Sequence, residues 1–188
     1  MYEVGVFVPR KTMSDLSEVF SRKMRLSGIG QQVERRIEAN AAECAALAAL
    51  YDLPGIASLS GEFLLRHEQR GIIAAELLLR AKVTQICVIT LDPFDAVIAE
   101  EACLRFVPAA AIPEAAELVL DPETLEGPDE IPYTGETMDL GAVLAEQLAL
   151  ALDPYPKKPG ATLPADMTGE NANPFAALQR LKDRDTLI

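Results

Sequence analysis

Few residues of the types that perform acid–base, nucleophilic or metal chemistry occur in this chain of 188 residues. His67 is the single histidine, and wide gaps separate the three cysteines, Cys44, Cys87 and Cys103. A Ser-His-Asp or Cys-His mechanism would have one candidate base and no local signature around it. We therefore predict no catalytic residue, and we assign His67 the ordinary role of a surface histidine at a strand end.

The same scarcity argues against a cofactor or a metal ion. The glycines nearest to a phosphate-loop pattern, Gly28 and Gly30, have no basic anchor residue. Carboxylates are abundant after Glu114, but a proline-rich segment lacks the buried setting that separates two pKa values for acid–base work. The cysteines lie among apolar residues, which is typical of reduced, buried thiols. The sequence thus predicts no cofactor, no metal site and no small-molecule substrate.

Composition limits the class of protein further. Hydrophobic residues make up 49% of the chain, enough for one ordinary core. No apolar run approaches the roughly 20 residues of a membrane span, and residues 1–20 lack the features of a signal peptide. We expect one domain with a tail, in the cytoplasm and without a membrane partner.

Charge is distributed unevenly along the chain, whose formal net charge is −12. Residues 1–36 carry a local excess of positive charge, whereas residues 114–139 carry nine acids and neither lysine nor arginine. An acidic run repels phosphate and favours a basic protein partner, although its usual role is that of a solvated linker. Any direct RNA contact is expected in the basic region, at Arg22, Lys23, Arg25, Arg35 and Arg36.

Alternation of apolar and polar residues predicts a half-buried strand from Val33 to Ala39. Asn40 and Glu43 then have the spacing of a capping box, which predicts a helix over about 41–52 that ends before Pro54. Residues 57–67, 73–83 and 94–106 alternate again between turn-like segments, and together they predict an antiparallel meander. Within the meander, window 75–80 is also rich in helix-forming residues, so a helix is the alternative there.

The second half of the chain predicts one further helix and an extended tail. Leu118 to Leu120 has the pattern of a short edge strand, and Asp139 is a suitable N-cap for a helix that Asp153-Pro154 ends. In the tail, Phe175, Leu178 and Leu181 recur at helical spacing between glycine- and proline-rich stretches. We expect these three side chains to dock on a partner or on the domain itself.

These patterns predict an α+β fold in which one antiparallel sheet packs with helices around 41–52 and 139–152. On the meander parity, Ala57 and Leu59 face the core together. The expected organisation is an N-terminal extension over 1–19, an α+β domain over 20–158 and a flexible tail over 159–188 that contains a short amphipathic helix.

Three segments, ordered along the chain, resemble the YceD family, named for large ribosomal RNA subunit accumulation. They are Gln85 to Leu91, Asp139 to Pro156, and Asn173 to Lys182. The likeness runs from about Phe20 onward. Many family members carry Cys-x-x-Cys where this chain has Cys87-Val88-Ile89-Thr90, so the second of two zinc-binding thiolates is missing. This form looks like the alphaproteobacterial branch of the family.

The resemblance implies a bacterial, non-enzymatic factor that supports accumulation of large-subunit (23S) ribosomal RNA during ribosome biogenesis. Its implied partner is that RNA or a pre-ribosomal particle. The net charge of −12 lacks the basic footprint of an RNA-binding domain. An acidic, chaperone-like binder of a basic ribosomal protein is therefore an alternative, and an enzyme with an unrecognised site is a further one.

Overall fold

Two sheets and three helices make up the computed structural model, which describes residues 13–111 and 127–162. A five-stranded sheet has the order β2-β3-β4-β5-β6, and β1 pairs with β7 in a separate two-stranded sheet. The predicted α+β class is confirmed. The elements are α1 (Met13–Val19), β1 (Lys23–Arg25), β2 (Gln32–Glu38), α2 (Ala41–Leu50), β3 (Gly55–His67), β4 (Ile73–Ile86), β5 (Pro93–Pro108), β6 (Asp129–Tyr133), β7 (Thr137–Asp139) and α4 (Leu140–Ala151).

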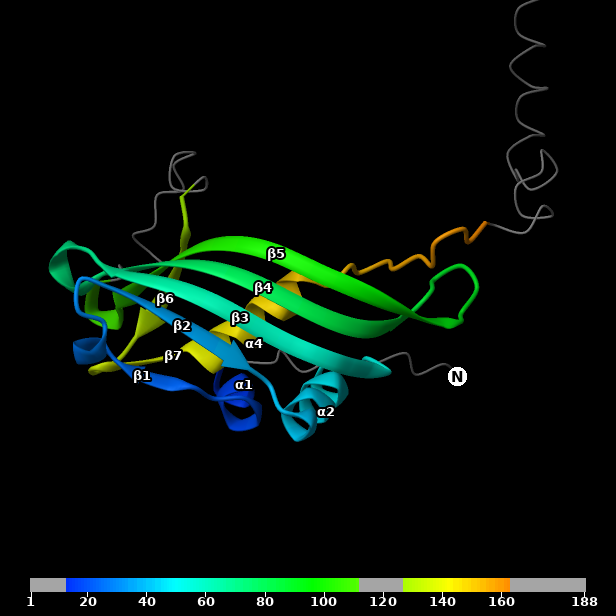
Figure 1. Cartoon of the computed structure of the whole chain (residues 1–188), viewed down its shortest axis with the longest axis horizontal. Helices are drawn as coiled ribbons and strands as arrows, with labels where there is room; N and C mark the ends of the chain where they lie inside the picture. Colours follow the sequence, from blue (N-terminus) through cyan, green and yellow to red (C-terminus); the bar gives the residue numbers. More distant parts are fainter. Residues whose placement is uncertain (1–12, 112–126, 163–188) are drawn as a thin grey trace, which may run out of the picture.

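The large sheet buries one of its faces and exposes the other, as alternation in its strands requires. In β4 every second side chain from Ile73 to Val83 is buried, while those between them are at most half-buried. Figure 1 shows α4 crossing beneath β3, β4 and β5, with α1 and α2 on the same side. The meander over β3, β4 and β5 is confirmed. The helical alternative for 75–80 is wrong, because that window pairs with strands on both sides.

A bulge in β3 changes one predicted orientation. The register with β4 shifts between Ile56 and Ser58. Ile56 and Leu59 are consequently both buried, although three positions separate them, and Ala57 is exposed rather than on the core side. A single inserted residue moves the side chains beyond it to the opposite face of the sheet. A strict two-residue period in the sequence does not predict this.

The acidic run is not a linker over its whole length. Its last part forms β6, which pairs in parallel with β5, and β7, which pairs with β1. Ile131 and Tyr133 face the core, and the Tyr133 hydroxyl donates a hydrogen bond to the Gly71 carbonyl at 2.7 Å. Pro132 is tolerated because β6 is the edge strand of its sheet. Burial of alternate residues therefore outweighs the turn-like composition here.

The capping box at the start of α2 is confirmed. The Asn40 side chain accepts a hydrogen bond from the Glu43 amide at 3.0 Å, and the Glu43 carboxylate accepts one from the Asn40 amide at 2.8 Å. Beyond the helix end, the Tyr51 hydroxyl donates to the Ala145 carbonyl at 2.8 Å. This hydrogen bond joins the end of α2 to α4 beneath the sheet.

Helix α4 begins at a junction with the chain before β1. The predicted N-cap, Asp139, accepts hydrogen bonds from the amides of Gly141 and Ala142 at 3.1 and 3.2 Å. The same carboxylate accepts the Ser21 hydroxyl at 2.6 Å and the Arg22 amide at 2.8 Å. Burial raises the pKa of Asp139, but these hydrogen bonds outweigh it and hold that pKa below its ordinary value. One side chain thus caps a helix and fixes a distant segment.

The last part of residues 1–19, the predicted N-terminal extension, contributes to the hydrophobic core. Leu16 of α1 is buried and Phe20 is fully buried, both within the same core cluster as Leu144 and Leu148 of α4. The domain limits at 20 and 158 stay predictions. The candidate strand at 118–120 and the tail side chains Phe175, Leu178 and Leu181 lie outside the described residues.

Gly141 offers a direct test of the junction. A Cβ atom there would lie 2.7 Å from the Arg22 amide nitrogen and 2.9 Å from the Phe20 carbonyl oxygen, both backbone atoms. Helix propensity alone would make Gly141→Ala stabilising by about 1 kcal/mol. We expect instead a loss of about 1–3 kcal/mol in the free energy of unfolding, because the clash displaces backbone. Urea denaturation of the purified variant measures this difference.

Gly28→Ala is the matched control for that experiment. A Cβ atom at Gly28 would meet only the Met24 methyl group, at 3.8 Å, which is ordinary van der Waals contact. Its unfolding midpoint should match that of the parent protein. A Gly141→Ala variant as stable as this control would contradict the described junction.

Candidate functional site

Arg22, the first of the five predicted RNA-contact residues, is held within the structure. Its guanidinium nitrogens donate to both carboxylate oxygens of Glu43 at 2.8 Å, and the group lies 4.7 Å from the centre of the Phe20 ring. One of the nitrogens also donates to the Ser21 carbonyl at 2.8 Å. A bidentate pair with a stacked ring fixes the orientation of the guanidinium. Arg22 therefore connects α2 to the start of β1.

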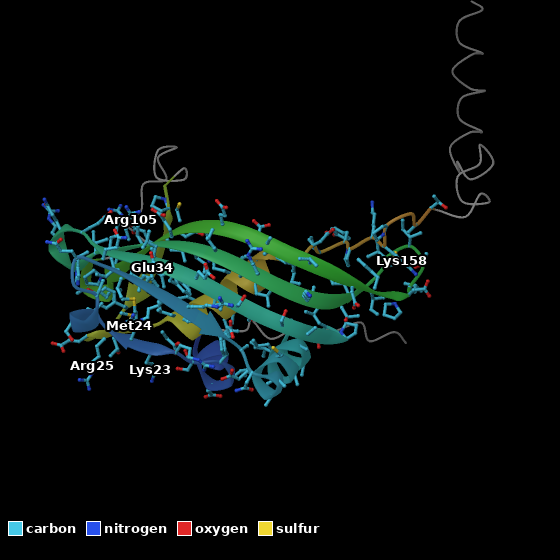
Figure 2. All side chains as sticks on the ribbon, in the orientation of Figure 1. Lys23, Met24, Arg25, Glu34, Arg105 and Lys158 are labelled. Atoms are coloured by element: carbon cyan, nitrogen blue, oxygen red, sulfur yellow. The ribbon has the colours of Figure 1, made fainter. Side chains whose placement is uncertain are left out.

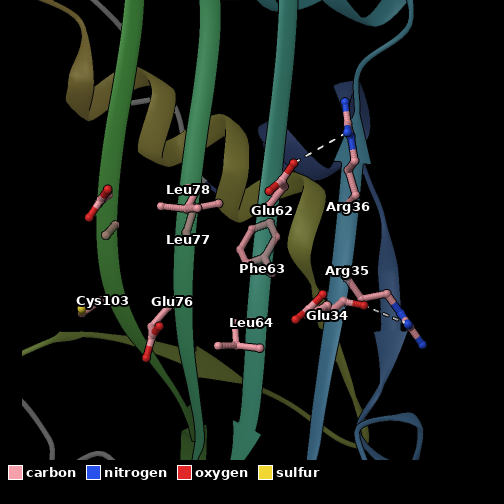
Figure 3. A pocket seen from close by; sticks show the side chains of 12 residues that line it. Glu34, Arg35, Arg36, Glu62, Phe63, Leu64, Glu76, Leu77, Leu78 and Cys103 are labelled. Carbon is pink, nitrogen blue, oxygen red and sulfur yellow. Dashed lines mark hydrogen bonds and ion pairs between the residues drawn. The ribbon is translucent and has the colours of Figure 1, made fainter.

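Arg35 and Arg36 of β2 point to opposite sides, as neighbours on a strand must. Arg36 lies on the exposed face of the large sheet, where it forms ion pairs with Glu38 at 2.6 Å and with Glu62 at 3.7 Å. Figure 3 shows Arg35 turned away over the outer edge of β2, where it donates to the Glu34 carbonyl at 3.1 Å. The two adjacent cations therefore lie on different surfaces, Arg36 on the exposed face of the sheet and Arg35 at the outer edge of β2.

Lys23 and Arg25 are both exposed and lie on one side of β1, since one residue separates them. Figure 2 shows both pointing away from the large sheet. Across residues 13–111 and 127–162, no ion pair is found for Lys23, Arg25 or Arg35. Of the five predicted residues, Arg22 and Arg36 thus form ion pairs with glutamates. The other three have no acidic partner among the described residues. The role of all five in RNA contact stays a prediction.

At the opposite end of the molecule, the loop between β4 and β5 is bound to the segment that follows α4. The Val88 amide donates to the Pro156 carbonyl at 2.9 Å, and the Gln85 side chain donates to the Asp153 carbonyl at 3.3 Å. Cys87 is fully buried, and its sulfur accepts the Lys158 amide at 3.3 Å. Figure 2 places Lys158 far from Lys23 and Arg25. These contacts hold the hairpin tip against residues 153–158.

The Cys87 thiol has an unusual setting for a buried cysteine. The hydrogen bond from the Lys158 amide lowers the pKa of Cys87 to about 7, against the opposing effect of burial. The Ile89 amide adds a second donor to the sulfur at 3.4 Å, while the Thr90 hydroxyl accepts the Asp92 amide at 3.4 Å. Cys87 therefore does not simply fill the core, as its apolar neighbours suggested. Backbone amides stabilise its thiolate.

The other chemistry-bearing residues do not gather around Cys87. Cys44 is buried in α2, whereas Cys103 is exposed, so the prediction of a buried thiol is wrong there. The reason is parity, since Leu104 of β5 takes the core side and its neighbour must face out. His67 lies exposed at the end of β3, 3.4 Å from the Leu26 carbonyl. Within the described ranges, no three His, Cys, Asp or Glu residues lie close enough to hold a metal ion.

A hollow of about 590 Å³ lies on the exposed face of the large sheet, across the middle of β2 to β5. Leu64 and Leu78 form its apolar floor, and Figure 3 shows both pointing out of the sheet while Phe63 and Leu77 point behind it. Carboxylates surround these two leucines on all four strands. They belong to Glu34, Glu62, Glu76 and Glu101.

One protein-family model matches this chain over a range that includes the Cys87 loop. The family model described as "Large ribosomal RNA subunit accumulation protein YceD" matches residues 75–182, which is more than half of the chain. The chain therefore belongs to the YceD family. The match begins within β4 and includes both the Cys87 loop and α4.

Searches of curated proteins and of solved structures gave no significant match. In the described part of the chain, no helix has the length and apolar character needed to cross a membrane.

Sequence reasoning missed both the contact of Cys87 with residues 153–158 and the hollow. The contact of Cys87 could have been suspected from the sequence. Two of the three segments that resemble the family, 85–91 and 139–156, adjoin it. The hollow left a weaker signal, namely leucines at the outward positions of β3 and β4. Alternation places those leucines outside, but it does not say which other side chains share the face.

Reversing the three cations without a described ion pair tests the RNA prediction. We expect Lys23→Glu, Arg25→Glu and Arg35→Glu together to abolish retention of ribosomal RNA fragments. The salt dependence of binding should flatten too, because single-strand binding scales as about 0.7 per neutralised phosphate. Filter binding across a salt series measures both effects. Retention with an unchanged salt slope would place the contact elsewhere.

The Cys87 thiolate makes a second prediction, concerning pH. A thiol whose pKa is lowered by folding contributes stability that is full above the unfolded value, about 8.5, and lost as pH falls through about 7. The parent protein should therefore gain stability relative to Cys87→Ser as the pH rises from 6 to 9. Parallel urea titrations of the two proteins measure this difference. A constant difference across that range would contradict a stabilised thiolate.

Proposed function

We propose that this protein is a non-enzymatic cytoplasmic factor that supports the accumulation of large-subunit (23S) ribosomal RNA during ribosome biogenesis. The observation that carries the proposal is the YceD family match over residues 75–182. That range holds the Cys87 loop, the acidic run and α4.

The arrangement of charged and reactive residues supports a binding role. His67 has one carbonyl neighbour and is exposed, and Cys87 is buried behind its loop. Among the described residues, no side-chain hydrogen bond joins either group to a carboxylate, an amine or an imidazole. The described residues do provide two surfaces that could bind a partner. These are the cations of β1 and β2 at one edge and the hollow on the sheet.

A second candidate function is that of an acidic, chaperone-like binder of a basic ribosomal protein. The carboxylates around the hollow favour it, because an acidic surface attracts a basic protein and repels phosphate. The two candidates are compatible, since sequestering a ribosomal protein until its RNA is ready would also support RNA accumulation.

Removal of the gene tests the proposed function. We expect the ratio of large-subunit to small-subunit ribosomal RNA to fall during fast growth, because assembly intermediates that lack the factor are degraded. Quantitative RNA electrophoresis measures the ratio. Re-expression of the parent protein should restore it. An unchanged ratio in the deleted strain would count against the proposal.

A further inference from the structure

We infer that the exposed face of the large sheet binds a basic, leucine- or valine-containing segment of a partner protein in the hollow between β2 and β5. This deepens the proposed function and rests on it for the kind of partner. The inference is carried by three observations: an apolar floor, a surplus of carboxylates, and an uncovered face.

The apolar floor is unusual for the solvent side of a sheet. An antiparallel sheet with one buried face ordinarily carries polar residues on the other. Here Leu64 is half-buried and Leu78 is 43% exposed, although no element of the described chain packs on this side. Both belong to the two central strands of the hollow, opposite Glu76 and Glu62 respectively. An apolar side chain from a partner would remove both leucines from water.

Four carboxylates and two guanidinium groups, those of Arg35 and Arg36, line the hollow, so acidic groups are in surplus. Glu62 pairs with Arg36, and Glu76 pairs with Arg66. Glu34 on β2 and Glu101 on β5 have no ion pair among the described residues. These two carboxylates lie on the outer strands of the hollow, and β3 and β4, which carry the leucines, run between those strands. A ligand that has apolar side chains in its centre and cations at its flanks matches this order.

Other occupants fit this chemistry less well. Phosphate of an RNA would be repelled by the carboxylates. A second copy of this chain also carries a net charge of −12. The tail from residue 163 to 188 has four acidic and three basic residues, so its overall charge is slightly negative. A basic partner protein is the occupant that charge complementarity selects.

The experiment uses the full-length protein and a synthetic fluorescent peptide that has leucine or valine at its centre and lysine or arginine at both flanks. Two control peptides replace its apolar residues with serine or its basic residues with glutamate. Fluorescence anisotropy measures affinity. Cys103 lines the hollow and is exposed, while Cys44 and Cys87 are buried, so the alkylation rate of Cys103 by iodoacetamide reports where the peptide lies.

We expect the basic apolar peptide to bind and to slow the alkylation of Cys103, and both control peptides to bind more weakly. Glu34→Lys with Glu101→Lys should reduce affinity by about tenfold or more, since two complementary charges become repulsive. Glu18→Lys with Glu136→Lys makes the same change in net charge at exposed sites outside the hollow. That control should retain most of the affinity.

Three results would overturn the inference. The first is equal loss of affinity in both pairs of variants, which would mean that only net charge matters. The second is peptide binding without protection of Cys103. The third is faster alkylation of Cys103 without peptide when Phe175, Leu178 and Leu181 are replaced by serine, since the protein's own tail would then occupy the hollow. None of these readouts depends on ribosomal RNA levels, so the proposed function is tested separately.

Discussion

The carboxylate of Asp139 is the interaction on which the arrangement of this protein depends. It accepts hydrogen bonds from the first turn of α4 and from Ser21 and Arg22, residues more than a hundred positions earlier. The Leu140 amide returns a bond to the Arg22 carbonyl at 3.1 Å, and β1 pairs with β7 directly beside it. Because a half-buried carboxylate must be satisfied, these bonds fix where α4 enters beneath the sheet. The position of the apolar core follows from that entry.

Local rules predicted most of the elements, because in most of them local and tertiary preferences agree. The capping box at Asn40 and the cap at Asp139 use side chains within three residues of the groups they satisfy, so spacing alone reveals them. The failures at Ala57 and β6 have a different origin. A bulge and a parallel edge strand depend on partners far along the chain, and a two-residue period carries no information about them.

The candidate site was predicted less well than the fold, and for a related reason. Composition identified the basic region, but it could not separate Arg22, held by Glu43, from Lys23, which is exposed. Nor could it place Glu34 and Glu101 around one hollow, since they lie on β2 and β5. Surfaces of this kind are produced by strand register, which the sequence encodes only through the pairing of several strands.

The pairing of β1 with β7 also has a consequence for the order in which the protein folds. Strand β1 can pair with β7 only after Thr137 has been synthesised, because Arg25 and Thr137 pair directly. At about 5–20 residues per second, synthesis separates them by roughly 5 to 20 seconds. During that interval β2 to β5 can form their meander from neighbouring residues, but the segment around Phe20 has no place to pack. The N-terminal strand is therefore made early and folds late, so a growing chain presents Lys23 and Arg25 without their strand partner to the ribosome that makes it.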